Sequence, residues 1–373
     1  MTSSTSNGSR ASRTGLFVGA AVLAGIATAA WVESRARRAD RENPATGKMI
    51  DVDGVRLHYV ERGEGPPVVL IHGNTVWHRD FVASALFDRL AENHRVIAFD
   101  RPGFGHSSRP RDRLWTPAAQ ADLLHAALGV IGVGPAVILG HSMGSMVAMA
   151  MALNYPATVQ RLILLGGYYY PSMRVDAVLT APVALPILGD VMRYTVTPVS
   201  GRLMFKGLIK GMFAPREMPP SFLPLLSREM MLRPMQIRAN AEDAAFMIAQ
   251  AKASSERHHE LQMPVAILAG EKDLIVDMEA HSARLHADVP QSTLVVVPGT
   301  GHMVHYAATA EIIAAIDGIP GPNRPSPLRD RRPSKSTALI PVTRRRKWPP
   351  SKFHGLGRHW PAADGRKERC RQD

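Results

Sequence analysis

The sequence has one cysteine, Cys370, in 373 residues. A single cysteine excludes an internal disulfide framework and any cysteine-based zinc finger. The metal-binding patterns HExxH and HxHxD are absent as well, so the histidines carry no metal-site signature. Hydrophobic residues make up 45% of the chain and charged residues 21%. This ordinary globular composition excludes a collagen, a coiled coil and disorder of the whole chain.

The central part of the chain also lacks net charge, although the whole chain carries +13. Residues 321–373 carry a net charge of +11 and residues 1–47 carry +3, which leaves −1 for residues 48–320. The basicity therefore belongs to the two ends, and we expect no specific nucleic-acid partner. Residues 321–373 are rich in proline and are predicted to be a disordered tail. The alternative is a tail that contacts anionic lipid or nucleic acid.

An uncharged segment, residues 14–32, lies within the N-terminal extension 1–47. As a helix its 19 residues would span about 28 Å, close to the thickness of a membrane core. We predict a membrane anchor. A cleaved signal peptide, which would make the protein secreted or periplasmic, and a plain apolar extension are the alternatives. The positive-inside rule favours a cytoplasmic domain because four arginines follow the segment: Arg35, Arg37, Arg38 and Arg41.

Short apolar runs alternate with helical patterns over residues 48–167 and 263–320. Alternating residues at 50–52 and 55–60 predict an antiparallel hairpin at a sheet edge. Six continuous apolar runs predict buried parallel strands at 68–71, 96–99, 136–139, 162–165, 265–268 and 294–297. Helices are predicted between most of them, at 117–130, 143–154, 278–287 and 307–316. The pattern predicts an α/β fold with a doubly wound, mostly parallel sheet of eight strands.

The interval from residue 168 to residue 262 breaks this alternation. A loop of that length without structure is uncommon in a compact domain, so we predict an inserted subdomain. The interval contains nine prolines and nine of the 18 methionines. The prolines predict short, broken helices. The methionines suit a surface that adapts to apolar ligands, or they fill a core.

A Gly-x-Ser-x-Gly motif, from Gly140 through Ser142 to Gly144, lies directly between the predicted strand 136–139 and the predicted helix 143–154. In such a strand–turn–helix context the serine sits on a sharp turn that small neighbours permit. The helix N-terminus offers free N–H groups to an oxyanion. We therefore predict that Ser142 is a nucleophile.

A serine nucleophile needs a base, and the base needs an orienting acid. His302 follows the predicted strand 294–297, and Asp273 follows the predicted strand 265–268. The order Ser142, Asp273, His302 is the Ser…acid…His order of a hydrolase triad. We predict these three as the catalytic residues.

Neighbouring residues offer alternatives for two of these roles. Glu271 and Asp277 lie near Asp273 and are rival candidates for the acid. His305 lies three residues beyond His302 and is interpreted as a packing residue. His72 is interpreted as a residue that shapes its loop through a hydrogen bond.

An oxyanion hole requires two convergent donors. The N–H of Met143 follows the nucleophile and is the first. The N–H of Asn74 is the second, because Gly73 lets the loop approach closely. Three aromatic residues could line a substrate pocket or else pack in the core: Trp77, Phe81 and Tyr168.

Five motifs in this order resemble the α/β-hydrolase superfamily over residues 49–318. They are residues 69–74 (VLIHGN), 99–107 (FDRPGFGHS), 140–144 (GHSMG), 270–273 (GEKD) and 299–302 (GTGH). The resemblance implies that residues 168–262 form a helical cap over the active site. It also implies a hydrolase that uses no cofactor and no metal.

The identity of the nucleophile narrows the expected chemistry. Haloalkane dehalogenases and epoxide hydrolases resemble the chain in their loops but use an aspartate, where this chain has Ser142. We therefore expect an acyl-enzyme hydrolase acting on the ester of a small, lipophilic molecule. Carbon–carbon bond hydrolases and cofactor-free haloperoxidases share the same triad and remain alternatives. A catalytically idle ligand-binding protein is the alternative outside enzymes.

Overall fold

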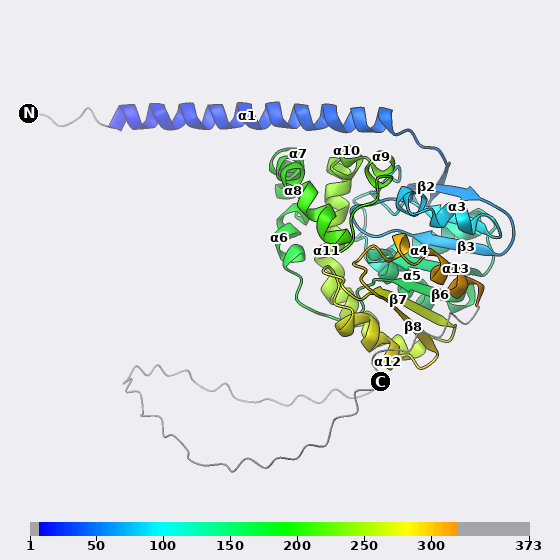
Figure 1. The fold of residues 1–373 in the computed structure, drawn as a ribbon. Coiled ribbons are helices and arrows are strands. Elements are labelled where there is room, and N and C mark those ends of the chain that lie inside the picture. The colour runs from blue at the N-terminus through cyan, green and yellow to red at the C-terminus, as the bar shows by residue number, and fades with distance from the viewer. Residues whose placement is uncertain (1–6, 319–373) are drawn as a thin grey trace, which may run out of the picture. The chain divides into compact units, whose positions relative to one another are not determined.

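The computed structural model describes residues 7–318 of the chain (Figure 1). For residues 7–15, 175 and 176 it describes the backbone alone. The predicted basic tail at 321–373, including Cys370, lies outside the described residues.

One eight-stranded sheet organises the molecule, as the alternating pattern predicted. Its strand order is β1-β2-β4-β3-β5-β6-β7-β8. β1 and β2 form the predicted antiparallel hairpin at one edge, β2 pairs antiparallel with β4, and all other pairs are parallel. The strands are β1 (Lys48–Val52), β2 (Val55–Arg62), β3 (Pro67–Ile71), β4 (Arg95–Phe99), β5 (Ala136–His141), β6 (Val159–Leu165), β7 (Val265–Gly270) and β8 (Ser292–Val297).

Helices cover both faces of this sheet, which is why the parallel strands read as continuous apolar runs. On β3, Val69 and Ile71 point into one core layer while Val68 and Leu70 point into the other. The first layer is closed by α4 (Pro117–Val130), α5 (Met143–Asn154) and α12 (Arg284–Asp288). The second is closed by α2 (Arg79–Ala83), α3 (Leu86–Leu90) and α13 (Thr309–Asp317).

The predicted helices differ from the observed ones mainly in short segments. The bounds of α4 and α5 agree with the prediction. The predicted helix at 278–287 is a π-helical turn, η3 (Glu279–Ala283), followed by α12. Three 3₁₀ turns were not predicted: η1 (Pro156–Thr158), η2 (His258–Glu260) and η4 (Val304–Tyr306). Nor were α2 and α3, because five residues are too few to establish a helical period.

Six helices lie between β6 and β7, and we call them the insertion. They are α6 (Val175–Ala184), α7 (Leu188–Tyr194), α8 (Val196–Phe213), α9 (Phe222–Leu226), α10 (Arg228–Met231) and α11 (Pro234–Ser255). The expectation of short, broken helices is wrong for α8 and α11, which have 18 and 22 residues. Pro198 and Pro234 lie in the first turns of these helices, where a proline removes no hydrogen bond.

A long helix, α1 (Asn7–Glu42), precedes the sheet and contains the predicted segment 14–32. It extends ten residues beyond that segment, and its second half contacts the insertion: Val32 and Ala39 are buried. Of the described residues, Leu16–Glu42 form the single unbroken helix that is long and apolar enough to cross a membrane. A signal sequence near an N-terminus has the same character.

The packing of α5 against β3 depends on a glycine. A Cβ atom at Gly144 would lie 2.1 Å from the Ile71 carbonyl oxygen. We expect Gly144→Ala to lower the free energy of unfolding by about 1–3 kcal/mol, because two backbone segments must separate. Gly129→Ala is the matched control, since a Cβ at that position of α4 meets nothing within 4 Å. Alanine there is expected to raise stability by up to about 1 kcal/mol. Chemical denaturation of both variants measures the difference, and equal effects would contradict this account.

Candidate active site

The predicted nucleophile lies on the turn between β5 and α5. Ser142 has φ 53° and ψ −120°, a backbone conformation that is costly for a residue with a side chain. Its N–H donates to the Leu165 carbonyl oxygen at 2.9 Å. A Cβ at Gly140 would lie 2.4 Å from the Gly144 carbonyl oxygen. The two glycines therefore permit the turn, as the motif predicted.

The predicted base and acid are in contact. His302 Nδ1 lies 2.8 Å from Asp273 Oδ2, and both side chains are almost completely buried. Burial opposes ionisation of Asp273, but the His302 ring and two N–H donors, from Val276 and Ile275, outweigh it and lower the pKa of this carboxyl. An ionised Asp273 accepts the Nδ1–H of His302, which leaves Nε2 free to accept a proton.

The rival acids have other partners. Glu271 is exposed, contacts Lys272 and accepts a hydrogen bond from the Gly299 N–H. Asp277 accepts the Ala280 N–H at 2.7 Å, at the start of η3. Neither contact involves His302, so the geometry favours Asp273 as its partner.

The loop that carries His302 is tied to the nucleophile turn. His141 Nε2, one residue before Ser142, donates to the His302 carbonyl oxygen at 3.2 Å. The ring of His305 packs against His141, and its Nε2 lies 2.9 Å from Asp80 Oδ2. His305 is thus a buried packing residue, as interpreted from the sequence. These contacts fix the position of the loop at residues 302–305 relative to the turn at Ser142.

The predicted oxyanion donors lie on either side of the nucleophile. Met143 is the first residue of α5, so its N–H has no acceptor within that helix. A Cβ at Gly73 would lie 3.0 Å from Ser142 Cβ, so this loop passes directly beside the serine. Within residues 7–318 the structure gives no acceptor for the Asn74 N–H. Both N–H groups are therefore available to a ligand.

A buried histidine shapes this loop. His72 Nδ1 donates to the Gly73 carbonyl oxygen at 2.7 Å, and its Nε2 accepts the Arg101 N–H at 2.9 Å. Burial, with the Arg101 charge acting in the same direction, lowers the pKa of His72 to about 3. His72 is therefore neutral near pH 7 and has the structural role interpreted from the sequence.

The Arg101 guanidinium contacts the same loop, at residues 72–74. It is fully buried and donates to the carbonyl oxygens of His72 and Gly73, at 2.8 and 3.1 Å. It also donates to Asn74 Oδ1 at 2.6 Å. Its charge is paired with Asp243 Oδ2 at 2.6 Å, on helix α11 of the insertion. A buried ion pair thereby fixes the loop that contains Asn74, the predicted oxyanion donor, to the insertion.

Helix α11 contacts the loop through two more polar residues. Asn240 Oδ1 accepts the Thr75 N–H, and Gln236 donates to the Thr75 carbonyl oxygen, each at 2.7 Å. Gln236, Asn240 and Asp243 are spaced by four and three residues, so they share one helix face. These three polar residues on one helix face are a sequence signal in an otherwise apolar insertion, and a search for motifs does not detect it. Arg101 lies in the motif at residues 99–107, and the motif alone does not indicate its role.

Comparison with known proteins agrees with this geometry. A family model described as alpha/beta hydrolase fold matches residues 66–309. The chain belongs to the α/β-hydrolase fold family.

Relatives of this hydrolase catalyse different reactions. It is 34% identical to 2-hydroxymuconate semialdehyde hydrolase of Pseudomonas putida over 128 residues, 34% of this chain and less than half, 46%, of that relative. It is 26% identical to haloalkane dehalogenase 2 of Mycobacterium bovis, over 73% of this chain and 94% of that relative. A solved esterase from Thermogutta terrifontis matches with a TM-score of 0.61 and 25% identity, over 74% of this chain and 97% of that structure.

The three aromatic residues predicted for a substrate pocket lie in different places. Trp77 is fully buried among apolar residues of the insertion and donates its indole N–H to the Leu226 carbonyl oxygen. Phe81 is fully buried in the second core layer. Trp77 and Phe81 therefore pack in the core, which was the alternative to lining a substrate pocket. Tyr168 packs against Met143 and Met146, next to the nucleophile turn.

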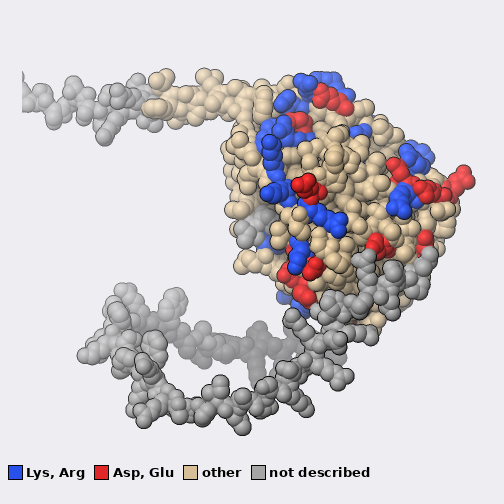
Figure 2. All heavy atoms as spheres, in the orientation of Figure 1, with Lys and Arg blue, Asp and Glu red and all other residues tan. Residues whose placement is uncertain are grey.

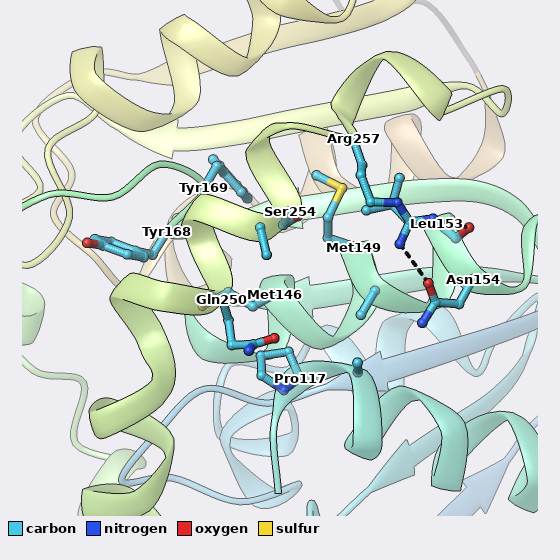
Figure 3. Close-up of a pocket in the computed structure, with 13 residues that line it drawn as sticks. Pro117, Met146, Met149, Leu153, Asn154, Tyr168, Tyr169, Gln250, Ser254 and Arg257 are labelled. Carbon is cyan, nitrogen blue, oxygen red and sulfur yellow. Dashed lines mark hydrogen bonds between the residues drawn. The ribbon is translucent and has the colours of Figure 1, made fainter. Parts of the chain in front are cut away.

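Tyr168 also lines a pocket of about 110 Å³ between α4, α5 and α11 (Figure 3). Met146 and Met149 form its apolar wall. At one end Arg257 donates to Asn154 Oδ1 at 3.0 Å. Ser142, Asp273 and His302 do not line this pocket. Tyr168 thus belongs both to the pocket wall and to the apolar cluster that contains Met143.

Among residues 7–318, two buried groups have metal-ligating side chains close together: His58, His78 and Asp100, and Asp80, His141 and His305. In the first group both Asp100 oxygens already accept N–H donors, from His58 and His78, each at 2.8 Å. Burial opposes ionisation of Asp100, but the two histidines outweigh it and hold the pKa of this carboxyl well below its usual range. In the second group the Asp80 oxygens accept from His305 and Tyr306. These hydrogen bonds account for the first group without an ion. In the second group, His141 Nδ1 lies 3.9 Å from Asp80 Oδ2 and has no hydrogen-bond partner among the described residues.

We expect Asp273→Asn to slow covalent labelling of Ser142 by a fluorophosphonate by about 10⁴-fold, because an amide favours the wrong tautomer of His302. The labelling rate is followed by intact-protein mass spectrometry. Asp277→Asn is the matched control, since Asp277 bonds only to its own helical turn, and its labelling rate should remain near wild type. Similar losses in the two variants would contradict the assignment of the acid.

We expect Asp243→Asn to lower the free energy of unfolding by about 3–5 kcal/mol, because this carboxylate pairs with two buried guanidinium groups, those of Arg101 and Arg109. Asp190→Asn is the matched control: Asp190 pairs with Arg111 and Arg193 but is one-third exposed. Its cost should stay below about 1 kcal/mol. Thermal unfolding of both variants measures the two losses in stability. Equal losses would show that the buried Asp243 ion pairs stabilise the fold no more than an exposed pair does.

Proposed function

We propose that this α/β hydrolase is a serine esterase that cleaves a carboxylic ester of a small, lipophilic substrate through an acyl-enzyme. The observation that carries the proposal is the 2.8 Å contact between His302 Nδ1 and Asp273 Oδ2, beside a serine on a strained turn. A serine hydroxyl requires such an oriented base to act as a nucleophile.

The reaction follows from these positions. His302 Nε2 accepts the hydroxyl proton as Ser142 Oγ attacks the ester carbonyl, and the Asn74 and Met143 N–H groups bind the oxyanion. His302 then returns the proton to the leaving alcohol. A water molecule, deprotonated by His302, attacks the acyl-enzyme and releases the acid. Asp273 stays ionised throughout and stabilises the imidazolium form of His302.

A carbon–carbon bond hydrolase is the second candidate. The similarity to 2-hydroxymuconate semialdehyde hydrolase favours it, although the match covers under half of that relative. Both reactions use the same three side chains, so only the substrate distinguishes them. Haloperoxidase activity and an idle ligand-binding protein are weaker alternatives, because neither gains support from a further contact in the site.

We also propose that α1 anchors the protein to a membrane through residues 14–32, with the hydrolase on the cytoplasmic side. The support is its uncharged length and the exposure of its apolar residues before Trp31. In the alternative, a signal peptide is removed from this segment and the protein is secreted or periplasmic. In the part of α1 that the structure describes, the helix runs without a break to Glu42 and packs on the insertion, which favours retention.

We expect the full-length protein to hydrolyse p-nitrophenyl acetate, butyrate and octanoate, with a kcat/KM that does not fall as the acyl chain lengthens. Ser142→Ala should abolish this activity, and Ser255→Ala, which changes an exposed serine at the end of α11, should not. Activity on a vinylogous 1,5-diketone, but not on esters, would favour the carbon–carbon hydrolase. A folded protein that turns over neither substrate and is not labelled by a fluorophosphonate would support the idle alternative.

A further inference from the structure

Exposed apolar side chains are concentrated in two places. Of the 23 large apolar residues that are exposed in the described part of the chain, 18 lie in α1 or between residues 178 and 208. The second group covers α6, α7 and α8, and we call it the outer apolar face. It includes Leu179, Ile187, Leu203 and Met204, each more than 70% exposed. A contiguous exposed apolar surface of this kind marks an interaction site.

Helix α8 shows that this exposure is not the ordinary outer side of a surface helix. Its inner face packs Phe205 and Ile209 into the insertion. Its outer face carries Val199, Leu203 and Met204, where a helix in contact with water would be polar. A helix that is apolar on both faces requires an apolar partner on each of them.

The outer apolar face is continuous with α1. Trp31 of α1 lies under the guanidinium of Arg202 of α8, at 4.7 Å. Farther along α1, Asp40 pairs with Arg233 of the insertion. Residues 16–24 of α1 are exposed, so the helix leaves the globule beside α7 and α8 (Figure 1). A bilayer crossed by α1 would therefore begin at the outer apolar face.

Charge around this face also fits a lipid surface. Lys206 and Lys210 are exposed on α8 and lie seven residues after Val199 and Leu203, on the same outer side, where their long side chains can reach phosphate groups. Trp31, half-exposed, lies where α1 meets the insertion, a depth that tryptophan prefers in membranes. Figure 2 shows an uncharged surface along the edge of the globule next to α1, with a row of Lys and Arg side chains beside it.

We propose that the outer apolar face of α6–α8 is a membrane-docking surface that lies in the interface of the same bilayer that α1 crosses. This inference rests on the proposed membrane anchor. It adds that the insertion, whose helix α11 holds the oxyanion loop, is positioned at the lipid surface. A lipophilic ester then reaches the enzyme from the bilayer and not from water. A second copy of the chain is the competing partner for this face.

The experiment uses the full-length protein in vesicles of phosphatidylcholine and phosphatidylglycerol. Because the sequence has one cysteine, Cys370→Ser gives a background for single spin labels. Labels are placed at Leu203 on the outer apolar face, at Val22 on α1 and at Leu274, an exposed leucine outside both groups. Electron paramagnetic resonance then compares collisions with oxygen, which enriches in lipid, and with a water-soluble nickel complex.

We expect the labels at positions 22 and 203 to collide mainly with oxygen, and the label at 274 with the nickel complex. Nickel access at 203 with oxygen access at 22 would overturn the docking surface and leave the anchor intact. Nickel access at both positions would overturn the anchor as well. A label at 203 shielded from both reagents, with a short intermolecular distance, would assign the face to a second copy and overturn the proposal.

An activity measurement separates this inference from the proposed esterase. Leu203→Glu combined with Met204→Glu should leave turnover of p-nitrophenyl acetate in water unchanged. The same variant should lose about tenfold or more in the rate on an ester dissolved in the vesicles, because two apolar side chains that contact lipid in the proposed arrangement become charged. Leu274→Glu is the control for added charge. Equal rates of variant and wild type on the dissolved ester would contradict docking, whereas an inactive wild type would contradict the esterase.

Discussion

The buried ion pair between Arg101 and Asp243 connects the two parts of this molecule. The Arg101 guanidinium is fully buried, so its charge is stabilised by Asp243, by the oxygens to which it donates and by the Phe104 ring, 4.4 Å away. Two of those oxygens belong to the backbone of the loop beside Ser142. The geometry of the loop at residues 72–75 and the position of helix α11 are thus one constraint, and neither can shift without exposing or unpairing a buried charge.

The sheet supplies the second constraint. Strands β5, β7 and β8 run parallel, so their carboxyl ends meet at one edge, and the residues that follow them come together there. Ser142, Asp273 and His302 each follow one of these strands. The serine conformation is costly by itself. Gly140 and Gly144 allow the turn, and the close packing of α5 on β3 holds Ser142 in this conformation. The strain is maintained by the packing of the fold.

The exposed surface of the described residues has a polar part and an apolar part. Most of the described globule is polar outside, whereas α1 and the outer side of α6–α8 are apolar and adjoin one another. The same insertion that presents this face also contacts the loop at residues 72–75 through α11. In the proposed arrangement, contact with lipid and the organisation of the site involve one group of helices.

Local sequence patterns were enough to predict the strands, the larger helices around the sheet and the residues proposed for the triad, because each depends on a continuous apolar run or on a motif directly after one. They also indicated the uncharged N-terminal segment. Only the tertiary structure decided that Trp77 and Phe81 are core residues, that Asp273 and not Glu271 contacts His302, and that Arg101 meets Asp243, 142 residues away. Such contacts depend on how helices cross and which charges are buried together, and no local pattern records that geometry.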